Sequence, residues 1–565
     1  MLRIAIAQLN PTVGDFDGNA VQIIDAMQRA AAGRADLVAF PELAVCGYYP
    51  GDLLEEPRFL RNIEAALERI IAATRALPGL TAVIGAPRRN TGPGKPLFNA
   101  LLAVREGAIV AEYHKQLLPV YGVFDDGRHF EAGPEVACVL PLKGVRVGFL
   151  ICEDGWNDDL RSYRVNPFQK LADAGAQLVL SINASPSDVG KRAQRHTLFR
   201  AACLRRDMAL LYVNQVGGQD QLVYDGASFA MSPQQGLAFE AARFAPDFQL
   251  LAFEDSHFLR ADGAGVPQLV DETLATPEFY RRQIILGLRD YARRCGFERV
   301  VVGSSGGIDS ALTIALAAEA LGPQNVVAVT MPSRFSSTGS VDDSETLCRA
   351  LGVQLFRHPI ADLVREFEDG FAKAFSAPLR GLPLENLQAR VRGAVLMEYS
   401  NGFGALLLTT GNKSEISVGY CTLYGDTNGG LGLIGDLYKT EVYALARHLN
   451  AAASRELIPG AVLDKPPSAE LAPDQRDTDS LPPYEVLDEI LKWHIEGDRL
   501  PAAEARAVSA FVENLRGTEE GAALVERICR LIARNEYKRR QSPPVIRVRT
   551  RAFGSGRQIP IAVKY

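Results

Sequence analysis

The chain has few of the residues that would mark a metal cage or a disulfide scaffold. Its eight cysteines are scattered over 565 residues, and no two of them form a Cys-x-x-Cys pair. This excludes the usual zinc ligand spacing and a disulfide framework. No charge-free run of about 18 apolar residues is present, which argues against a membrane span. The apolar opening at residues 2–7 is too short for a signal peptide, so we expect a cytoplasmic protein.

The chain also has little excess charge of either sign. Its formal net charge is -6 and its pI is about 5.8, which does not favour a dominant nucleic-acid surface. Apolar residues make up 47% and charged residues 23% of the sequence, an ordinary composition for a globular protein. The length allows roughly two to four domains with their own cores. We therefore expect a multidomain enzyme with neither nucleic-acid nor membrane partners.

Residues 1–260 alternate between strand-like and helical stretches, and this order predicts an α/β layered domain. The pattern predicts a helix at 20–32 and strands at 4–9, 37–40, 82–84, 100–104, 145–151, 178–182 and 210–213. Glycines and a proline after Asp262 then interrupt the pattern, and we place a linker at 261–275.

Three of these strand-like stretches lead into a reactive side chain, namely Glu42, Lys115 and Cys152. Polar groups at the strand ends of such sheets commonly face one crevice. A thiol, with a reference pKa of about 8.5, needs a base to take its proton and a cation to stabilise the charge that develops. Glu42 can be that base and Lys115 the oxyanion partner. Each residue alone also fits a structural role, but the three together indicate a nucleophilic hydrolase.

These three residues resemble the Glu-Lys-Cys triad of the nitrilase superfamily, whose members form an αββα sandwich. The stretches KQLLPVYGVFD (115–125) and NASPSDVGKR (183–192) are similar to the glutaminase branch of that superfamily. The resemblance implies a nitrilase-like glutamine amidohydrolase domain over 1–260. It also implies that the glutamine is held by Tyr121, Ser185 and Lys191, with its α-carboxylate paired to the lysine.

A second site is predicted where the apolar strand 300–302 meets an Ala- and Leu-rich helix at 311–321. The loop between them lies at a helix N-terminus, where unpaired N–H groups and the helix dipole attract anions. Asp309 adds a carboxylate suited to Mg²⁺. The loop lacks the Gly-Lys-Ser/Thr of a Walker motif and the spaced glycines of a dinucleotide fingerprint. Its residues are Gly303, Ser304, Ser305, Gly306, Gly307, Ile308, Asp309 and Ser310.

The following stretches continue the alternation of strand and helix. Strands are predicted at 326–331, 354–358 and 406–408, and helices at 279–295, 341–351 and from 385 onward. This order implies right-handed crossovers and a doubly wound parallel sheet. A second polar loop at 409–415 follows a strand, and two such loops at one sheet edge favour a ligand crevice.

The string SGGIDS at 305–310 resembles the SGGxDS loop of the ATP pyrophosphatases, which cleave ATP between its α- and β-phosphates. With the stretches 385–390, 410–415, 423–426, 436–440 and 465–470, the second half is similar to NAD synthetase. The whole chain therefore resembles the glutamine-dependent NAD⁺ synthetase family. The resemblance implies that Mg²⁺ is bound by Asp309 and Glu415, that ATP contacts the 303–310 loop, Thr410 and Lys439, and that deamido-NAD⁺ contacts Asn386, Glu415 and Lys538.

The resemblance implies the following reaction. Glutamine is hydrolysed to glutamate and ammonia, ATP adenylates deamido-NAD⁺, and ammonia displaces AMP to give NAD⁺, with pyrophosphate as the other product. Mg²⁺ accompanies ATP, and no prosthetic group is expected. Two alternatives remain open, an ATP-pyrophosphatase amidotransferase with another acceptor and a nucleotide-sensing protein that only hydrolyses amides. Glutamine-dependent release of AMP and pyrophosphate with different acceptors separates the three.

We expect the Rossmann-like ATP-pyrophosphatase domain at 276–545 and a C-terminal arm at 546–565. The basic stretch 547–551 in that arm fits a contact with another copy better than a contact with nucleic acid, because the chain is acidic. This favours a homo-oligomer. Residues 473–483, rich in proline and aspartate, form either a lid over the adenylate or a simple connector.

Overall fold

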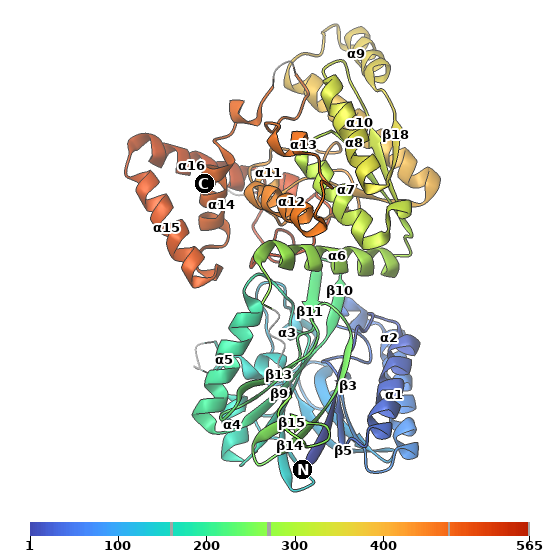
Figure 1. Cartoon of the computed structure of the whole chain (residues 1–565), viewed down its shortest axis with the longest axis vertical. Coiled ribbons are helices and arrows are strands. Elements are labelled where there is room, and N and C mark those ends of the chain that lie inside the picture. Colours follow the sequence, from blue (N-terminus) through green and yellow to red (C-terminus); the bar gives the residue numbers. More distant parts are fainter. Residues whose placement is uncertain (159–161, 268–272, 473–474, 563–565) are drawn as a thin grey trace. The chain divides into compact units, whose positions relative to one another are not determined.

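A computed structural model describes residues 1–158, 162–267, 273–472 and 475–562, and the chain divides into two compact units (Figure 1). The first unit comprises Met1–Gln219 and Val223–Thr273, and the second comprises Asp220–Leu222 and Leu274–Tyr565. Of the expected linker and arm, residues 268–272 and 563–565 lie outside the described residues. In the described ranges, every helix is too short or too polar to cross a bilayer.

The first unit is built mainly from β-strands. They are β1 (Leu2–Gln8), β2 (Leu37–Ala39), β3 (Thr81–Arg89), β4 (Leu97–Arg105), β5 (Ala108–His114), β6 (Val139–Leu142), β7 (Val145–Ile151), β8 (Leu178–Asn183), β9 (Ala209–Asn214), β10 (Val216–Gln219), β11 (Leu222–Asp225), β12 (Phe229–Ser232), β13 (Gly236–Glu240), β14 (Asp247–Glu254) and β15 (His257–Arg260). Its helices are α1 (Phe16–Ala32), α2 (Pro57–Ala73), α3 (Asp126–His129), α4 (Pro167–Asp173) and α5 (Lys191–Arg206).

All of these strands except β10 and β11, which pair with each other, form two large sheets. One has the order β15-β14-β1-β2-β3-β4-β5 and the other β13-β12-β9-β8-β7-β6. Strand β7 shows why the sheets stack, because Phe149 and Ile151 join the core between the sheets while Leu150 packs with Phe168 and Phe199 of the helices. Helices α4 and α5 cover one outer face, and α1 and α2 lie along β2 and β3 on the other (Figure 1). The predicted αββα sandwich is confirmed.

The second unit contains one sheet and many helices. The strands are β16 (Arg299–Gly303), β17 (Val326–Thr330), β18 (Gln354–Arg357), β19 (Ala405–Thr409) and β20 (Leu431–Gly432). The helices are α6 (Thr276–Arg294), α7 (Ile308–Leu321), α8 (Thr338–Leu351), α9 (Ala361–Phe375), α10 (Leu382–Phe403), α11 (Lys413–Val418), α12 (Lys439–Ala453), α13 (Gly460–Asp464), α14 (Tyr484–Ile495), α15 (Ala502–Arg516), α16 (Glu519–Arg534) and α17 (Glu536–Arg539).

The strand order of this sheet is β18-β17-β16-β19-β20, and all of its neighbouring pairs are parallel. The chain runs outward from β16 through β17 to β18 and then returns to the other side of β16 with β19. The carboxyl ends of β16 and β19 therefore flank the topological switch point, where doubly wound sheets bind their ligands. The predicted doubly wound parallel sheet is confirmed.

The basic stretch 547–551 differs from the arm that the sequence led us to expect. Arg549 is 2% exposed, and its guanidinium is paired with Glu441, Glu496 and Glu504 of the same unit. A charge this deeply buried requires such partners. Arg549 is thus part of the interior of the second unit rather than a contact for another copy.

Candidate active sites

Glu42 and Lys115 meet in the interior of the first unit. Nζ of Lys115 lies 2.7 Å from Oε1 of Glu42 and 2.7 Å from Oδ2 of Asp126, and all three side chains are almost fully buried. The amide of Asn99 donates to Oε1 of Glu42 at 2.8 Å, and the N–H of Ala184 donates to Oε2 at 3.0 Å. Two carboxylates thus share one ammonium, and the remaining acceptor positions of Glu42 are held by fixed donors.

The charges around Glu42 suit it to take a proton. Burial raises the pKa of the Glu42 carboxyl, the nearby charge of Asp126 raises it further, and Lys115 offsets part of this rise. A carboxylate with a raised pKa is a better general base than one in water. Asp126 was not recognised from the sequence. It is a second carboxylate beside Lys115, in addition to the predicted Glu42.

Cys152 begins the short 3-10 turn after β7, and its backbone φ of 43° lies in the left-handed region. That conformation costs a residue with a Cβ about 1–2 kcal/mol, so the surrounding structure must hold it. Burial and the charge of Glu42 raise the pKa of the Cys152 thiol, while Lys115 opposes the rise. The charges of Glu42 and Lys115 thus both act on the Cys152 thiol, whose raised pKa means that it needs a base to become a nucleophile.

Asp154 joins the segments that carry Lys115 and Cys152. Its Oδ1 accepts from the N–H groups of Gln116 at 3.0 Å and Leu117 at 2.9 Å. Its Oδ2 accepts from the hydroxyl of Tyr113 at 2.8 Å and from the N–H of Ile151 at 3.1 Å. Burial raises the pKa of Asp154 to about 7 in spite of these donors. The carboxyl group thus ties the segment after β5 to the end of β7, which belongs to the other sheet.

The three residues expected to hold glutamine have different surroundings. Tyr121 donates its hydroxyl to Glu153 at 3.0 Å, and Glu153 directly follows Cys152 in the chain. Nζ of Lys191 lies 3.8 Å from the ring centroid of Trp156. Both therefore lie beside the 3-10 turn that begins at Cys152. Ser185 is buried, and its N–H donates to Oδ1 of Asn214 at 2.9 Å. The sequence analysis did not identify Glu153 as a site residue, because a Glu directly after a Cys forms no motif that indicates a function.

A cavity of about 590 Å³ opens at the carboxyl ends of β16 and β19. It lies at the switch point of the sheet, as expected for a doubly wound fold. Its walls contain Gly303, Ser304, Ser305, Gly307, Ile308, Asp309, Asn386, Thr410, Glu415, Lys439 and Lys538, all of which were predicted site residues.

The two remaining residues of the 303–310 loop, Gly306 and Ser310, do not line the cavity. Gly306 has a φ of 75°, and a Cβ at this position would lie 2.4 Å from the backbone oxygen of Ser340. Only glycine fits such a close approach. The hydroxyl of Ser310 donates to the backbone oxygen of Gly307 at 3.0 Å. Both residues determine the conformation of the loop that faces the cavity.

Lys439 links the two expected metal ligands. Its Nζ lies 2.5 Å from Oδ2 of Asp309 and 3.1 Å from Oε1 of Glu415, and Asn412 donates to Oδ1 of Asp309 at 2.9 Å. Burial raises the pKa of Glu415 to about 8, with a further rise from Asp309 and an opposing effect of Lys439. Two half-buried carboxylates face one ammonium here, so a hard divalent cation with oxygen preference fits the donor set and the charge.

Asn386 and Lys538 contact the same loop. Oδ1 of Asn386 accepts from the hydroxyl of Thr422 at 2.8 Å. Nζ of Lys538 donates to the backbone oxygens of Gly419 at 2.7 Å and Cys421 at 2.8 Å. The structure therefore brings residues of α10 and α17 together at one end of the cavity.

The stretch 473–483 contributes to the cavity as well. Residues 473 and 474 lie outside the described residues, but Gln475, Asp477 and Ser480 line the wall. Asp477 is 4% exposed and accepts a hydrogen bond from the hydroxyl of Tyr484 at 2.7 Å. Sequence reasoning missed Asp477, because three aspartates among prolines gave no sign of which one is buried.

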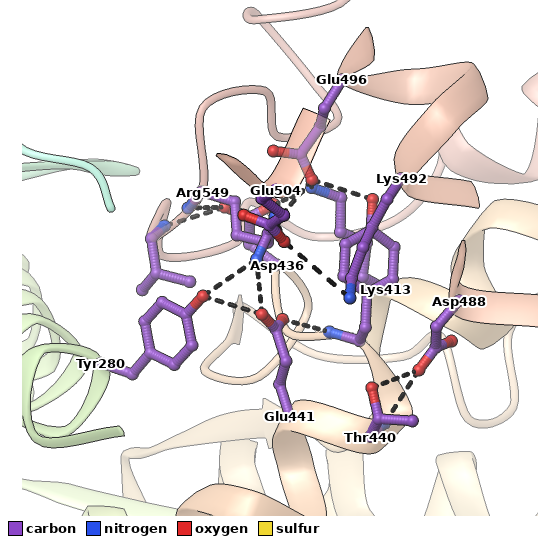
Figure 2. A network of polar contacts seen from close by, with 12 residues as sticks. Tyr280, Lys413, Asp436, Thr440, Glu441, Asp488, Lys492, Glu496, Glu504 and Arg549 are labelled. Atoms are coloured by element: carbon purple, nitrogen blue, oxygen red, sulfur yellow. Dashed lines mark hydrogen bonds and ion pairs between the residues drawn. The ribbon is translucent and has the colours of Figure 1, made fainter. Parts of the chain in front are cut away.

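A buried ionic network lies within the second unit (Figure 2). Arg549 is at its centre, with Nε 2.7 Å from Glu496 and Nη2 2.9 Å from Glu504. Lys413 pairs with Oδ1 of Asp436 at 2.8 Å and with Glu496 at 3.3 Å. The network connects the start of α11, the segment before α12 and the stretch after residue 545 within one unit.

The chain matches two family models. The carbon-nitrogen hydrolase model matches residues 3–248, and the NAD synthase model matches residues 280–542. The glutamine-dependent NAD(+) synthetase of Synechocystis sp. is 41% identical, with 100% of this chain and 99% of the relative covered. That of Xanthomonas campestris pv. campestris is 42% identical, with 100% and 98% covered.

Two solved structures are also similar. That of glutamine-dependent NAD+ synthetase from Acinetobacter baumannii in complex with adenosine diphosphate has a TM-score of 0.76 and 35% identity, and the match covers 99% of this chain and 98% of that one. A glutamine-dependent NAD(+) synthetase from Cytophaga hutchinsonii has a TM-score of 0.80 at 22% identity, with 99% and 97% covered, which supports the fold alone. Both similarities span the two units.

Proposed function

Because this chain belongs to the glutamine-dependent NAD⁺ synthetases, and is thus a ligase that takes its nitrogen from glutamine, we propose how its own residues carry out the two half-reactions. The observation that carries the proposal is the cavity at the switch point of the second sheet. Lys439 joins Asp309 and Glu415 there, directly beside the SGGIDS loop. Nucleotide use follows from the family, whereas the residue roles below are our inference.

In the first unit, Glu42 takes the proton of the Cys152 thiol as sulfur attacks the amide carbon of glutamine. Lys115 stabilises the oxyanion that forms, because its ammonium is held rigidly and away from water. Collapse of the intermediate breaks the C–N bond, and the protonated carboxyl of Glu42 gives its proton to the leaving –NH₂ group, which departs as ammonia. Water then hydrolyses the thioester with Glu42 as the base, which releases glutamate and restores the thiol.

Selection of glutamine over simpler amides is assigned to the surroundings of Cys152. We infer that Lys191, held over the ring of Trp156, pairs with the α-carboxylate of glutamine, as suggested by the family resemblance. Tyr121 lies beside the Cys152 turn through its hydrogen bond to Glu153. Ser185 supplies a buried hydroxyl on the segment that follows β8.

In the second unit, the loop 303–310 binds the phosphates of ATP, and Thr410 and Lys439 make further contacts with the nucleotide. The N–H groups at the start of α7 and the ammonium of Lys439 are positioned to attract phosphate oxygens. We infer that Asp309 and Glu415 hold Mg²⁺, since both offer hard oxygens and face an excess of negative charge. When bound, Mg²⁺ would neutralise phosphate charge that develops during AMP transfer.

We propose deamido-NAD⁺ as the acceptor, with Asn386, Glu415 and Lys538 at its end of the cavity. Its nicotinate carboxylate attacks the α-phosphorus of ATP, pyrophosphate leaves, and ammonia then displaces AMP from the acyl adenylate with loss of a proton. The acceptor is inferred from the family and from the position of these residues in one cavity wall. Further proposals are a cytoplasmic location, domains at 1–260 and 276–545, and a homo-oligomeric state whose contacts do not involve the buried Arg549.

An acceptor assay tests this assignment. The purified enzyme is given glutamine, ATP and Mg²⁺, with deamido-NAD⁺ or with other carboxylates, and the release of AMP and pyrophosphate is measured. We expect glutamine-dependent release only with deamido-NAD⁺. Comparable release with another carboxylate would favour a different acceptor, and glutamate formation without AMP under all conditions would favour the amidase alternative.

A further inference from the structure

Two residues that line the synthetase cavity, Glu415 and Lys439, lie in the first turns of two different helices. Lys439 is the first residue of α12, and Glu415 is the third residue of α11. The ammonium and the carboxylate therefore reach Asp309 only if both helices begin at the right place. A displacement of about 1 Å at such a point can cost about a hundredfold in rate.

Asp488 of α14 bridges the starts of these two helices. Its Oδ1 accepts from the hydroxyl of Ser414. Its Oδ2 accepts from the N–H of Thr440 at 2.9 Å and from the Thr440 hydroxyl at 2.8 Å (Figure 2). The Ser414 hydroxyl also accepts from the N–H of Lys439 at 2.9 Å. One carboxylate thus contacts the residue before Glu415 and the residue after Lys439.

Asp488 is buried outside the wall of the cavity. It is 1% exposed and does not belong to the residues that line the cavity. A buried carboxylate is costly unless it is well bonded, and its position at the N-terminus of α12 is favourable for a negative charge. Burial raises the pKa of Asp488 to about 6, and the hydrogen bonds from Ser414 and Thr440 limit that rise.

The same two helices are held independently from the other side. Glu441, in the first turn of α12, accepts a hydrogen bond from Tyr280 at 2.8 Å and is paired with Arg549 at 2.5 Å. Lys413, the first residue of α11, pairs with Asp436 and Glu496. With these outer contacts in place, the loss of Asp488 should shift the helix starts without releasing either helix from the unit.

We propose that Asp488 is a positioning residue of the synthetase site, which fixes the first turns of α11 and α12 so that Glu415 and Lys439 face Asp309. The proposal rests on the proposed function, because it assumes that Glu415 and Lys439 contact the metal and ATP. It gives a role to a residue that touches neither substrate nor metal, and it predicts a selective defect.

The first test uses Asp488→Asn with Glu485→Gln as the matched control, because Glu485 is an exposed acid on the same helix. NAD⁺ formation is measured with ammonium as the nitrogen source, so that only the synthetase half is assayed. For Asp488→Asn we expect kcat to fall about tenfold and the Mg²⁺ concentration for half-activation to rise about fivefold, as for a misplaced ligand. KM for deamido-NAD⁺ should rise less than the Mg²⁺ requirement, because Glu415 is displaced while Asn386 and Lys538 keep their places on α10 and α17.

A general loss of structure would not produce this split between kcat and KM. A folded Asp488→Asn enzyme with wild-type kcat and Mg²⁺ dependence would overturn the proposal, and so would an equal loss in Glu485→Gln. The same assay is applied to the variants Asp309→Asn and Glu415→Gln, which change the proposed metal ligands directly. If Asp309→Asn and Glu415→Gln are also unimpaired, the proposed function of the site fails; if only the Asp488 variant is unimpaired, the positioning role alone fails.

The second test covers the case in which Asp488→Asn does not fold. Thr440→Val removes the hydroxyl that donates to Asp488 and keeps the side-chain shape, whereas Thr440→Ser keeps the hydroxyl. We expect Thr440→Val to lower kcat about threefold and to raise the Mg²⁺ requirement, and Thr440→Ser to restore both. Equal activities in the two variants would contradict the inference.

Discussion

Oδ2 of Asp126 lies 2.7 Å from Nζ of Lys115, so the ammonium of the first site is shared between this carboxylate and Glu42. Asp126 thereby sets both the place of the cation and the basicity of Glu42, since its negative charge raises the pKa of Glu42. The group is buried and does not need to touch glutamine to influence the reaction.

Asp126→Asn tests this relationship. Removal of the negative charge stabilises the ionised form of Glu42, so the pKa of Glu42 should fall and the acidic limb of the kcat/KM profile should move to lower pH. We also expect glutamate release to slow by about tenfold, because a weaker base accepts the thiol proton less readily. The pH profile of glutaminase activity is the measurement, with the exposed Asp125→Asn as control. An unshifted acidic limb would show that Asp126 does not act through Glu42.

Lys115→Met removes the cation beside the expected oxyanion. Loss of one such stabiliser typically costs about two to three orders of magnitude in rate. The substitution also leaves Glu42 and Asp126 without their shared partner, so a thermal melt should accompany the assay of glutamate release. Glutaminase activity within about threefold of wild type in a folded variant would rule out the role of Lys115.

Cys152→Ala should separate the two half-reactions. Glutamine-driven NAD⁺ formation should be abolished, because no other thiol in the described structure interacts with Glu42 and Lys115 in the same way. Synthesis should persist with ammonium at alkaline pH, where more of it is neutral ammonia. A folded variant that is inactive with ammonium would contradict the chemical independence of the halves, and full activity with glutamine would remove Cys152 as the nucleophile.

Asp309→Asn and Glu415→Gln should each cripple NAD⁺ synthesis from ammonium and raise the Mg²⁺ requirement at least about tenfold, because Mg²⁺ prefers anionic oxygens. Basal glutamine hydrolysis at Cys152 should be spared, since both substitutions lie in the second unit. Synthesis and glutamate release are assayed over a Mg²⁺ titration. Unchanged Mg²⁺ dependence in both variants would contradict the metal assignment.

Glu496→Gln should weaken the second unit in a pH-dependent way. Burial alone would raise the pKa of Glu496, but Lys413 and Arg549 lower it to about 2. A carboxylate with a depressed folded pKa contributes stability above its unfolded pKa of about 4.5 and loses it as pH falls toward 2. We expect Glu496→Gln to lower the free energy of unfolding by about 3 kcal/mol at pH 7, with a smaller difference at pH 3.

Urea unfolding followed by tryptophan fluorescence measures this effect. The chain has two tryptophans, so a Trp156→Phe background leaves Trp493 of α14 as the probe of the second unit. Glu485→Gln is the charge-matched control and should leave the unfolding free energy nearly unchanged. A constant deficit from pH 7 to pH 3 would show that the ionised form of Glu496 is not what stabilises the unit.

Apolar runs allowed much of both sheets to be predicted from the sequence. The predicted strand at 145–151 coincides with β7, and the strands at 178–182 and 210–213 fall within β8 and β9. β8 and β9 are buried along their whole length and β7 is buried from Val147 onward, so their mostly apolar composition identifies them. The short strands β10 to β13 were not predicted, because few residues in them alternate clearly between apolar and polar.

Site residues could be predicted where they form one contiguous motif. They could not be predicted where a contact joins residues that are separated in the sequence. Residues 303–310 occupy one loop and could be recognised together. The contact between Lys115 and Asp126 and that between Asp488 and Thr440 connect positions that no spacing rule relates. Arg549 was misjudged for the same reason, because its burial depends on three carboxylates from α12, α15 and the segment after α14. A local sequence pattern cannot distinguish a buried arginine from an exposed one.

The pairing of β1 with β14 and the burial of Arg549 also determine the order in which the two units can fold during synthesis on the ribosome. The first sheet can close once Asp247–Glu254 has emerged to pair with Leu2–Gln8, whereas α12 must wait for Arg549, 108 residues after Glu441. Domains fold as units during synthesis, with the N-terminal one first. A nascent chain is thus expected to complete the fold of its first unit before that of its second, and a ribosome that stalls before codon 549 would leave Glu441 and Glu496 without their arginine partner.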